Sequence, residues 1–179
     1  MDCSLAFIKQ QLVPAMIDLE FWSDDRQFGL LIAEKQVAEM LHLCRRVSPF
    51  ETGGILLGHY AASHDRAIVT EITRAPADSQ SGSTWFVRGV RGLQQKLDRL
   101  WQRNQAYYLG EWHFHPFGPP RPSPTDQGQM QEISHSKQYH CPEPVLLILG
   151  GDPKAEWSAS AYVFPKDHRR IEMRIADAG

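Results

Sequence analysis

Residues 112–116 read WHFHP, and they close an apolar run that begins at Tyr107 and has the composition of a β-strand. Side chains alternate between the two faces of a strand, so His113 and His115, two positions apart, project from the same face. Two imidazoles on one face can bind a single metal ion. The stretch therefore predicts a strand that runs into a candidate metal site.

Asp126 is the candidate for a third metal ligand. Residues 123–126 read SPTD, which has the form of a helix start with Ser123 as the N-cap and Pro124 at the first helical position. Asp126 then lies on the first turn and faces back toward the end of the histidine strand. Two histidines and a carboxylate leave a fourth position for water, as in catalytic zinc sites. Taken singly, an H-x-H pair is more often surface or core histidine, and S-x-x-D is also an ordinary capping box.

A third stretch lies upstream, where residues 51–58 read ETGGILLG. Its apolar residues predict a buried strand over about 51–60, and its glycines indicate that another group approaches the backbone closely. Taken alone, Glu51 would be interpreted as a solvated acid at the start of a strand.

In this order and spacing, the three stretches resemble the JAB/MPN-plus (JAMM) zinc metallopeptidase family. The family pattern is an upstream Glu, then H-x-H, seven residues of which the first is Pro, and S-x-x-D, and every part of it is present here. The resemblance covers about residues 27–165. One departure is Phe114, because eukaryotic members often have Ser or Thr between the histidines. On an alternating strand Phe114 is expected to point away from the metal and into the core.

The resemblance implies a role for each motif residue. His113, His115 and Asp126 would hold one Zn²⁺ per chain. Glu51 would take a proton from the attacking water and pass it to the leaving amine, and the Ser123 hydroxyl would stabilise the oxyanion. If Ser123 also caps the helix, its hydroxyl serves both purposes only in part.

The short connection between His115 and Ser123 is similar to the compact prokaryotic branch of the family, found beside ubiquitin-like conjugation genes in anti-phage (CBASS) operons. Strings 85–89 and 110–112 are also similar to that branch. The resemblance implies an isopeptidase or peptidase that cleaves after the C-terminal glycine of a ubiquitin-like or E1/E2-conjugated protein, with E1/E2-like proteins as possible pathway partners. A non-catalytic MPN scaffold and a sulfur-carrier-processing peptidase are the alternatives.

An extended C-terminal tail is the shape that can bring a glycine to a recessed metal. We expect loops 76–85 and 116–122 to form its groove, with strand addition to a sheet edge and a gate for small residues beside the zinc. Trp85 is a candidate for the groove's rim.

Composition narrows the class of protein. A chain of 179 residues with 42% hydrophobic residues is long enough to bury one core without disulfides, and a net charge of −2 gives no reason to expect nucleic acid as a partner. The three cysteines, Cys3, Cys44 and Cys141, are odd in number and widely separated, which favours a reducing, cytoplasmic location. Neither a leader nor a membrane span is expected.

Periodicity and turn residues predict an α/β protein. Helices are expected at 34–46, at 90–103 and from 123 onward, and strands at 27–32, 51–60, 67–73, 107–115, 145–149, 158–164 and 171–175. Residues 78–83 are expected to be a polar loop. Residues 1–24 are expected to be an appendage with a short amphipathic helix ending near Pro14, and residues 25–179 a single JAB/MPN metallopeptidase domain. The resemblance implies the MPN fold, a mixed β-sheet sandwiched by helices with cytidine-deaminase-like layering.

The sequence lacks residues that other metal-site patterns require. Cupins need a Glu about four residues after H-x-H, and residues 116–122 contain no acid. The H-E-x-x-H and P-C-x-x-C motifs are absent. His135, His140 and Cys141 form a weaker candidate for a second zinc site.

Overall fold

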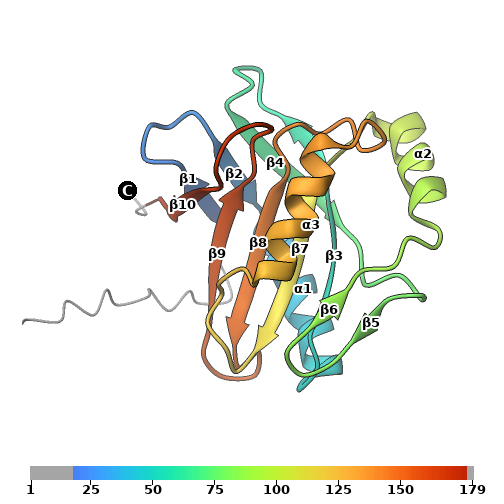
Figure 1. The fold of residues 1–179 in the computed structure, drawn as a ribbon, viewed down its shortest axis with the longest axis vertical. Coiled ribbons are helices and arrows are strands. Elements are labelled where there is room, and N and C mark those ends of the chain that lie inside the picture. Colours follow the sequence, from blue (N-terminus) through green and yellow to red (C-terminus); the bar gives the residue numbers. More distant parts are fainter. Residues whose placement is uncertain (1–17, 177–179) are drawn as a thin grey trace, which may run out of the picture.

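The protein is described by a computed structural model over residues 18–176, and Figure 1 shows its fold. Within this range the strands are β1 (Leu19–Trp22), β2 (Gly29–Ile32), β3 (Thr52–Tyr60), β4 (Arg66–Ile72), β5 (Gln80–Ser81), β6 (Phe86–Val87), β7 (Tyr107–Pro116), β8 (Val145–Gly151), β9 (Trp157–Val163) and β10 (Ile171–Ile175). The helices are α1 (Glu34–Val47), α2 (Leu93–Asn104) and α3 (Pro124–His135). The helices predicted at 34–46, at 90–103 and from 123 onward are all present in this range, and none of the described helices is long and apolar enough to span a membrane.

Eight strands form one closed sheet in the order β1-β10-β9-β8-β7-β3-β4-β2. The pairs β7–β8 and β2–β4 are parallel, and the other pairs are antiparallel. The sheet is therefore mixed, as predicted. Its closure was not predicted, and it arises because β1 pairs with both β2 and β10. The cytidine-deaminase-like layering stays a prediction.

Strand β1 lies inside the segment that the sequence assigned to an N-terminal appendage. Leu19 and Phe21 are buried in the main core, and the register places Phe21 opposite Ile175 of β10. Residues 19–22 are thus barrel residues, so the appendage assignment is wrong for them. The helix expected before Pro14 lies outside the described residues.

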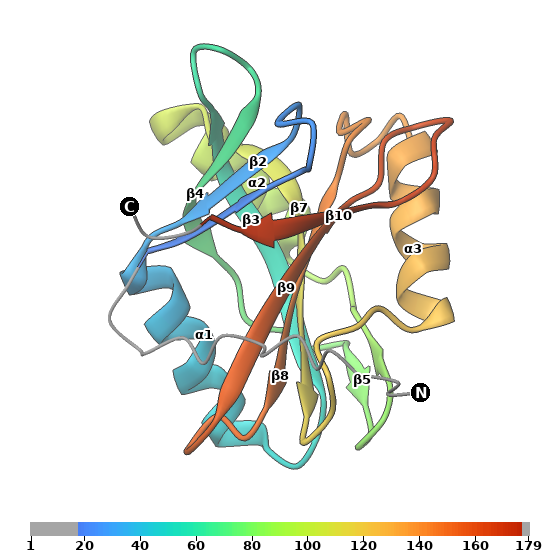
Figure 2. The same cartoon turned by 90° about the vertical axis from the view of Figure 1, so that its left-hand side faces the viewer.

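Helices cover both faces of the sheet around β8. Val145, Leu147 and Leu149 face the core that contains the apolar side of α1. Leu146 and Ile148 face a second core with residues of α2 and α3. Figure 2 shows α1 and α3 on opposite sides of β8 and β9. A strand buried on both faces has a continuous apolar sequence instead of an alternating one, as Val145–Leu149 does.

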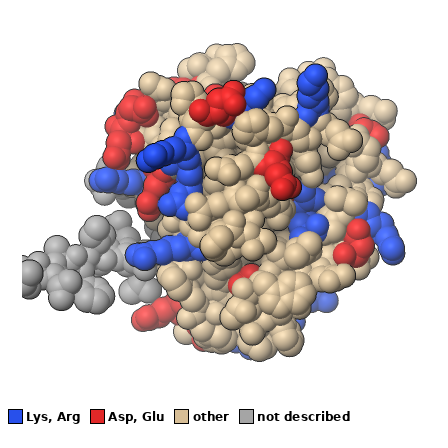
Figure 3. All heavy atoms as spheres, viewed as in Figure 1, with Lys and Arg blue, Asp and Glu red and all other residues tan. Residues whose placement is uncertain are grey.

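The polar segment 78–83 contains β5, which pairs with β6 in a small separate sheet. The prediction of a loop was wrong at residues 80 and 81, because Gln80 pairs with Val87 and Ser81 with Phe86. This hairpin lies next to the start of β3 in the barrel, since the Glu51 N–H donates to the Gly82 carbonyl oxygen at 2.8 Å. Figure 3 shows that acidic and basic side chains are interspersed on the face that carries α3.

Gly110 is the position where β7 tolerates no side chain. Its φ is +148°, and a Cβ there would lie 1.9 Å from the Val145 carbonyl oxygen on β8. We expect Gly110→Ala to destabilise the protein by about 2–6 kcal/mol, because overpacking and backbone strain each cost about 1–3 kcal/mol. Gly128→Ala in α3 is the control: a Cβ there meets nothing within 4 Å, and Ala favours a helix interior by about 0.5–1 kcal/mol. Thermal melting would test both, and an undiminished melting temperature for Gly110→Ala would contradict this account.

Candidate metal centre

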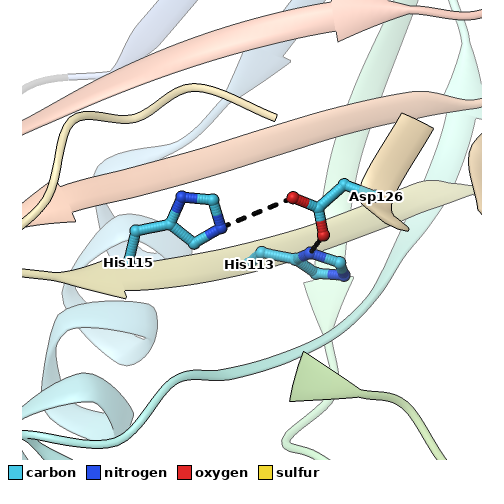
Figure 4. A group of neighbouring side chains, drawn as sticks. All are labelled: His113, His115 and Asp126. Atoms are coloured by element: carbon cyan, nitrogen blue, oxygen red, sulfur yellow. Dashed lines mark hydrogen bonds and ion pairs between the residues drawn. The ribbon is translucent and has the colours of Figure 1, made fainter. Parts of the chain in front are cut away.

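The structure brings His113, His115 and Asp126 together at the end of β7 (Figure 4). His113 Nδ1 lies 2.9 Å from Asp126 Oδ1, and His115 Nε2 lies 3.6 Å from Asp126 Oδ2. One potential ligand atom from each residue lies within 4.8 Å of the others. His113 and Asp126 are buried, and His115 is partly buried. The two histidines thus share a face as predicted, and their role as metal ligands stays a prediction.

A capping box at the start of α3 fixes the Asp126 carboxylate. Ser123 Oγ accepts from the Asp126 N–H at 3.1 Å, and the Ser123 N–H donates to Asp126 Oδ2 at 2.7 Å. The same carboxylate still contacts both histidines, so the cap and the candidate metal site coexist. Capping uses a lone pair of the Ser123 hydroxyl and leaves its proton for another acceptor.

Glu51 immediately precedes β3, which pairs with the histidine strand. The register places Thr52 opposite Phe114 and Gly53 opposite His113. The close approach expected near the glycines is present, because a Cβ on Gly53 would lie 2.9 Å from His113 Cδ2. Phe114 is buried in the core beside α1, as predicted.

Charge at this site favours a cation beside Asp126. Burial opposes ionisation of Asp126, but hydrogen bonds from His113 and Ser123 outweigh it and lower the carboxyl pKa to about 2. Burial also disfavours a charged His113, yet its bonds to Asp126 and Glu111 raise its pKa to about 9. The metal-free site therefore stabilises positive charge at the position where a metal ion would lie.

The pKa values of His115 and Glu51 are shifted in the directions that favour their neutral forms. Burial, with the positive charge of His113, lowers the pKa of His115, so its neutral form has a lone pair for a metal. Burial and the negative charge of Asp126 raise the pKa of Glu51 to about 7, although His113 opposes this. Glu51 can therefore gain and lose a proton near neutral pH. A donor set of two imidazoles and a carboxylate suits a zinc ion with an open position.

Glu111 was missed as a site residue. It is fully buried on the same face of β7 as His113, and its Oε2 lies 3.3 Å from His113 Nε2. Arg88 of the loop after β6 forms an ion pair with it at 2.7 Å. The available signal was an acid inside an otherwise apolar strand, two residues before a candidate ligand, because a buried charge needs a partner.

The second zinc candidate is not assembled. In the part of the chain that the structure describes, His113, His115 and Asp126 are the one group of three or more His, Cys, Asp or Glu with metal-ligand spacing. His135 instead pairs with Asp167 at 3.2 Å on the surface. Cys44 and Cys141 are buried and free, as the absence of a disulfide pattern predicted for them.

A cavity of about 620 Å³ opens between α2 and β7, away from the histidines. Its lining is mostly apolar and includes Leu93, Leu97 and Trp101, with Arg88 and Tyr108 at its inner end. Since none of the candidate ligands lines it, we place the chemistry at the histidine site, where the titratable groups converge.

The raised pKa of Glu51 predicts a pH-dependent stability. Its ordinary pKa is 4.5 and its pKa in the folded, metal-free protein is about 7, so the folded state holds this proton more tightly. The resulting stabilisation is present below the unfolded pKa and is lost as the pH rises through the folded one. Glu51→Gln cannot ionise, so its stability relative to wild type should be greater at about pH 8 than at about pH 4.5. Melting temperatures with chelator would test this, and an equal difference at both pH values would argue against the pKa shift.

Comparisons with known proteins identify the family of this chain. Residues 33–162 match the family of prokaryotic homologs of the JAB domain. A CD-NTase/cGAS isopeptidase of Enterobacter hormaechei is 42% identical over 157 residues, covering 88% of this chain and 87% of that protein. A probable metalloprotease, y4qB, of Sinorhizobium fredii is 27% identical over 135 residues, and this match covers 74% of the present chain and 81% of the y4qB protein. The solution structure of protein DSY2949 from Desulfitobacterium hafniense shares the fold, with a TM-score of 0.54, 21% identity and coverage of 81% of this chain and 88% of that one. The chain belongs to the family of prokaryotic homologs of the JAB domain.

Proposed function

We propose that this protein is a zinc-dependent isopeptidase or peptidase that cleaves after the C-terminal glycine of a ubiquitin-like protein or of a protein conjugated by E1/E2-like enzymes. The observation that carries the proposal is the convergence of His113, His115 and Asp126, with Glu51 immediately before the neighbouring strand β3. The similarity to the Enterobacter isopeptidase supports an isopeptide or peptide bond as the target, and it supports a role in a CBASS-type anti-phage system. We further propose a cytoplasmic location and a single catalytic domain that includes β1.

His113, His115 and Asp126 would hold one Zn²⁺ per chain. When bound, zinc supplies Lewis-acid chemistry, in which it lowers the pKa of a water ligand and polarises a carbonyl. The buried Asp126 carboxylate and the neutral His115 imidazole are the donor types that zinc requires.

Glu51 would move the proton. Because its pKa is about 7, the carboxylate can accept a proton from the attacking water and the resulting acid can give it to the leaving amine. The Ser123 hydroxyl, whose lone pair caps α3, would donate a hydrogen bond to the oxyanion.

The β5–β6 hairpin and loop 116–122 flank the site and would hold the substrate tail. Phe86 of β6 packs edge-on against His113, with ring centroids 5.3 Å apart. Trp85, next to Phe86, and Phe117, two residues after His115, are exposed by 49% and 67%. An extended tail could add to the short hairpin as a further strand, and a narrow passage beside Phe86 would admit glycine. The mixed surface charge in Figure 3 favours a protein tail over a polyanion.

Metal analysis tests the assignment of ligands. The purified protein should contain about one zinc per chain, and His113→Ala and Asp126→Ala should lose it, because removing a ligand removes a large share of the binding energy. His135→Ala and Asp167→Ala, from the surface His–Asp pair, are matched controls that should keep it. Glu51→Gln should keep zinc but lose cleavage by at least about 100-fold, since general acid–base catalysis contributes that much. A wild type that binds no zinc would point to a non-catalytic scaffold, and an active Glu51→Gln would remove Glu51 from the mechanism.

The narrow passage predicts a strict requirement for glycine in the substrate. In a ubiquitin-like protein fused or conjugated through its C-terminus, replacing the final glycine with Leu should abolish cleavage by the wild-type protein, because the proposed gate beside Phe86 would exclude a branched side chain. Zinc content is unaffected by such a change in the substrate. Cleavage rates followed by gel electrophoresis would decide, and equal rates for the two substrates would refute both the gate and the substrate class built on it.

A further inference from the structure

Glu111 is a fully buried carboxylate surrounded by four donors. Its side chain has no exposure, and it accepts from Arg88 Nε at 2.7 Å, Gln129 Nε2 at 2.8 Å, His113 Nε2 at 3.3 Å and the Tyr108 hydroxyl at 3.3 Å. A buried charge costs several kcal/mol unless it is paired and hydrogen-bonded, so this arrangement calls for a role that an apolar residue could not fill.

The two oxygens of Glu111 face different partners. Oε1 accepts from Arg88 and Tyr108, which lie on the side away from the candidate metal site. Oε2 accepts from Gln129 and from His113. Arg88 is itself held by the Gly89 carbonyl and the Tyr139 hydroxyl, each at 2.9 Å. The carboxylate is therefore fixed from behind, and one oxygen is presented to the His113 ring.

Helix α3 contributes to both ends of that ring. Asp126 and Gln129 are three residues apart and thus neighbours on the helix surface. Asp126 contacts Nδ1 of His113, and Gln129 holds the Glu111 oxygen that contacts Nε2. The His113 ring thus lies between two carboxylates, Asp126 at Nδ1 on the side of the candidate metal site and Glu111 at Nε2 on the opposite side.

We propose that Glu111 is a positioning residue for His113: it accepts the Nε2–H, which leaves the Nδ1 lone pair as the atom that binds the metal. This inference rests on the proposed function, because it takes His113 to be a ligand. A carboxylate or carbonyl that accepts from the second ring nitrogen commonly fixes the tautomer of a metal-binding histidine and raises its basicity. Arg88 and Gln129 act through Glu111.

The competing explanation is that Arg88 and Glu111 form only a structural ion pair between the β6 loop and β7. Both explanations predict a loss of stability when Glu111 is changed. The two explanations differ in what they predict for zinc binding, because a purely structural ion pair would change neither the zinc affinity nor which nitrogen of His113 is protonated. Zinc affinity and the state of the ring are therefore the informative measurements.

The test uses Glu111→Gln, which keeps the size of the side chain and removes its charge. Zinc affinity of the full chain, measured by competition with a chromogenic chelator, should fall about 10–100-fold, as is typical when an outer partner of a ligand is lost. Gln129→Ala, at a partly exposed position, should give a smaller fall in the same direction. Glu71→Gln, at a surface pair with Lys96, is the matched control and should bind zinc as wild type does. In zinc-loaded wild type, ¹⁵N spectra of His113 should show a protonated Nε2 and a metal-bound Nδ1.

Each result decides between the explanations. Unchanged zinc affinity in a folded Glu111→Gln protein would overturn the inference, as would a metal-bound Nε2 in the wild type. If Glu111→Gln does not fold, the affinity of Gln129→Ala and the wild-type spectrum carry the test. His113→Ala distinguishes a failure of the proposed metal site from a failure of the positioning role. If His113→Ala loses zinc while Glu111→Gln keeps it, the metal site is supported and the positioning role of Glu111 is wrong. If the wild-type protein has no affinity for zinc, both the proposed metal site and the positioning role of Glu111 are wrong.

Discussion

The alternation of side chains along β7 is the constraint on which the rest of the site depends. This strand lies between β3 and β8 in the sheet, and residues on both of its faces, such as Trp112 and His113, are buried. Trp112 and Phe114 point into the core beside α1, and Glu111, His113 and His115 point to the other face. One face is therefore apolar and stabilises the barrel, whereas the other buries ionisable groups that other elements must satisfy.

Those partners come from two different places in the chain. Helix α3 brings Asp126 and Gln129, and its capping box sets the depth at which the Asp126 carboxylate meets His113. The segment after β6 brings Arg88 to Glu111. Because removing one partner of a buried charged pair costs far more than the pair contributes, the elements are mutually dependent around His113. The face that carries chemistry is thus also a place where α3 and the β5–β6 hairpin are anchored to the barrel.

The surroundings of Asp126 and Glu51 shift the pKa values of these two carboxyl groups in opposite directions. Asp126 has a pKa of about 2 because donors from Ser123 and His113 surround it, whereas Glu51 has a pKa of about 7 because burial and Asp126 oppose its charge. One carboxylate remains charged beside the proposed metal and the other can exchange protons near neutrality. Two carboxyl groups with such different environments are suited to different roles in one reaction.

Local sequence determined the elements and most of the candidate site, because strand alternation and helix capping depend on residues that are near neighbours in the chain. The same face for His113 and His115, the cap at Ser123 and the burial of Phe114 followed from such patterns alone. Tertiary structure decided the partners that lie far apart. The four residues of β1 have too short a pattern to be recognised as a strand. All four pair with the nearby β2, and Phe21 and Trp22 also pair with β10, some 150 positions away in the chain, which closes the barrel. Likewise, Glu111 is stabilised by Arg88 and Gln129, whose positions depend on how the hairpin and α3 pack against β7. Nothing in the local sequence specifies those distances, because they are set by the closure of the barrel and by the packing of remote segments.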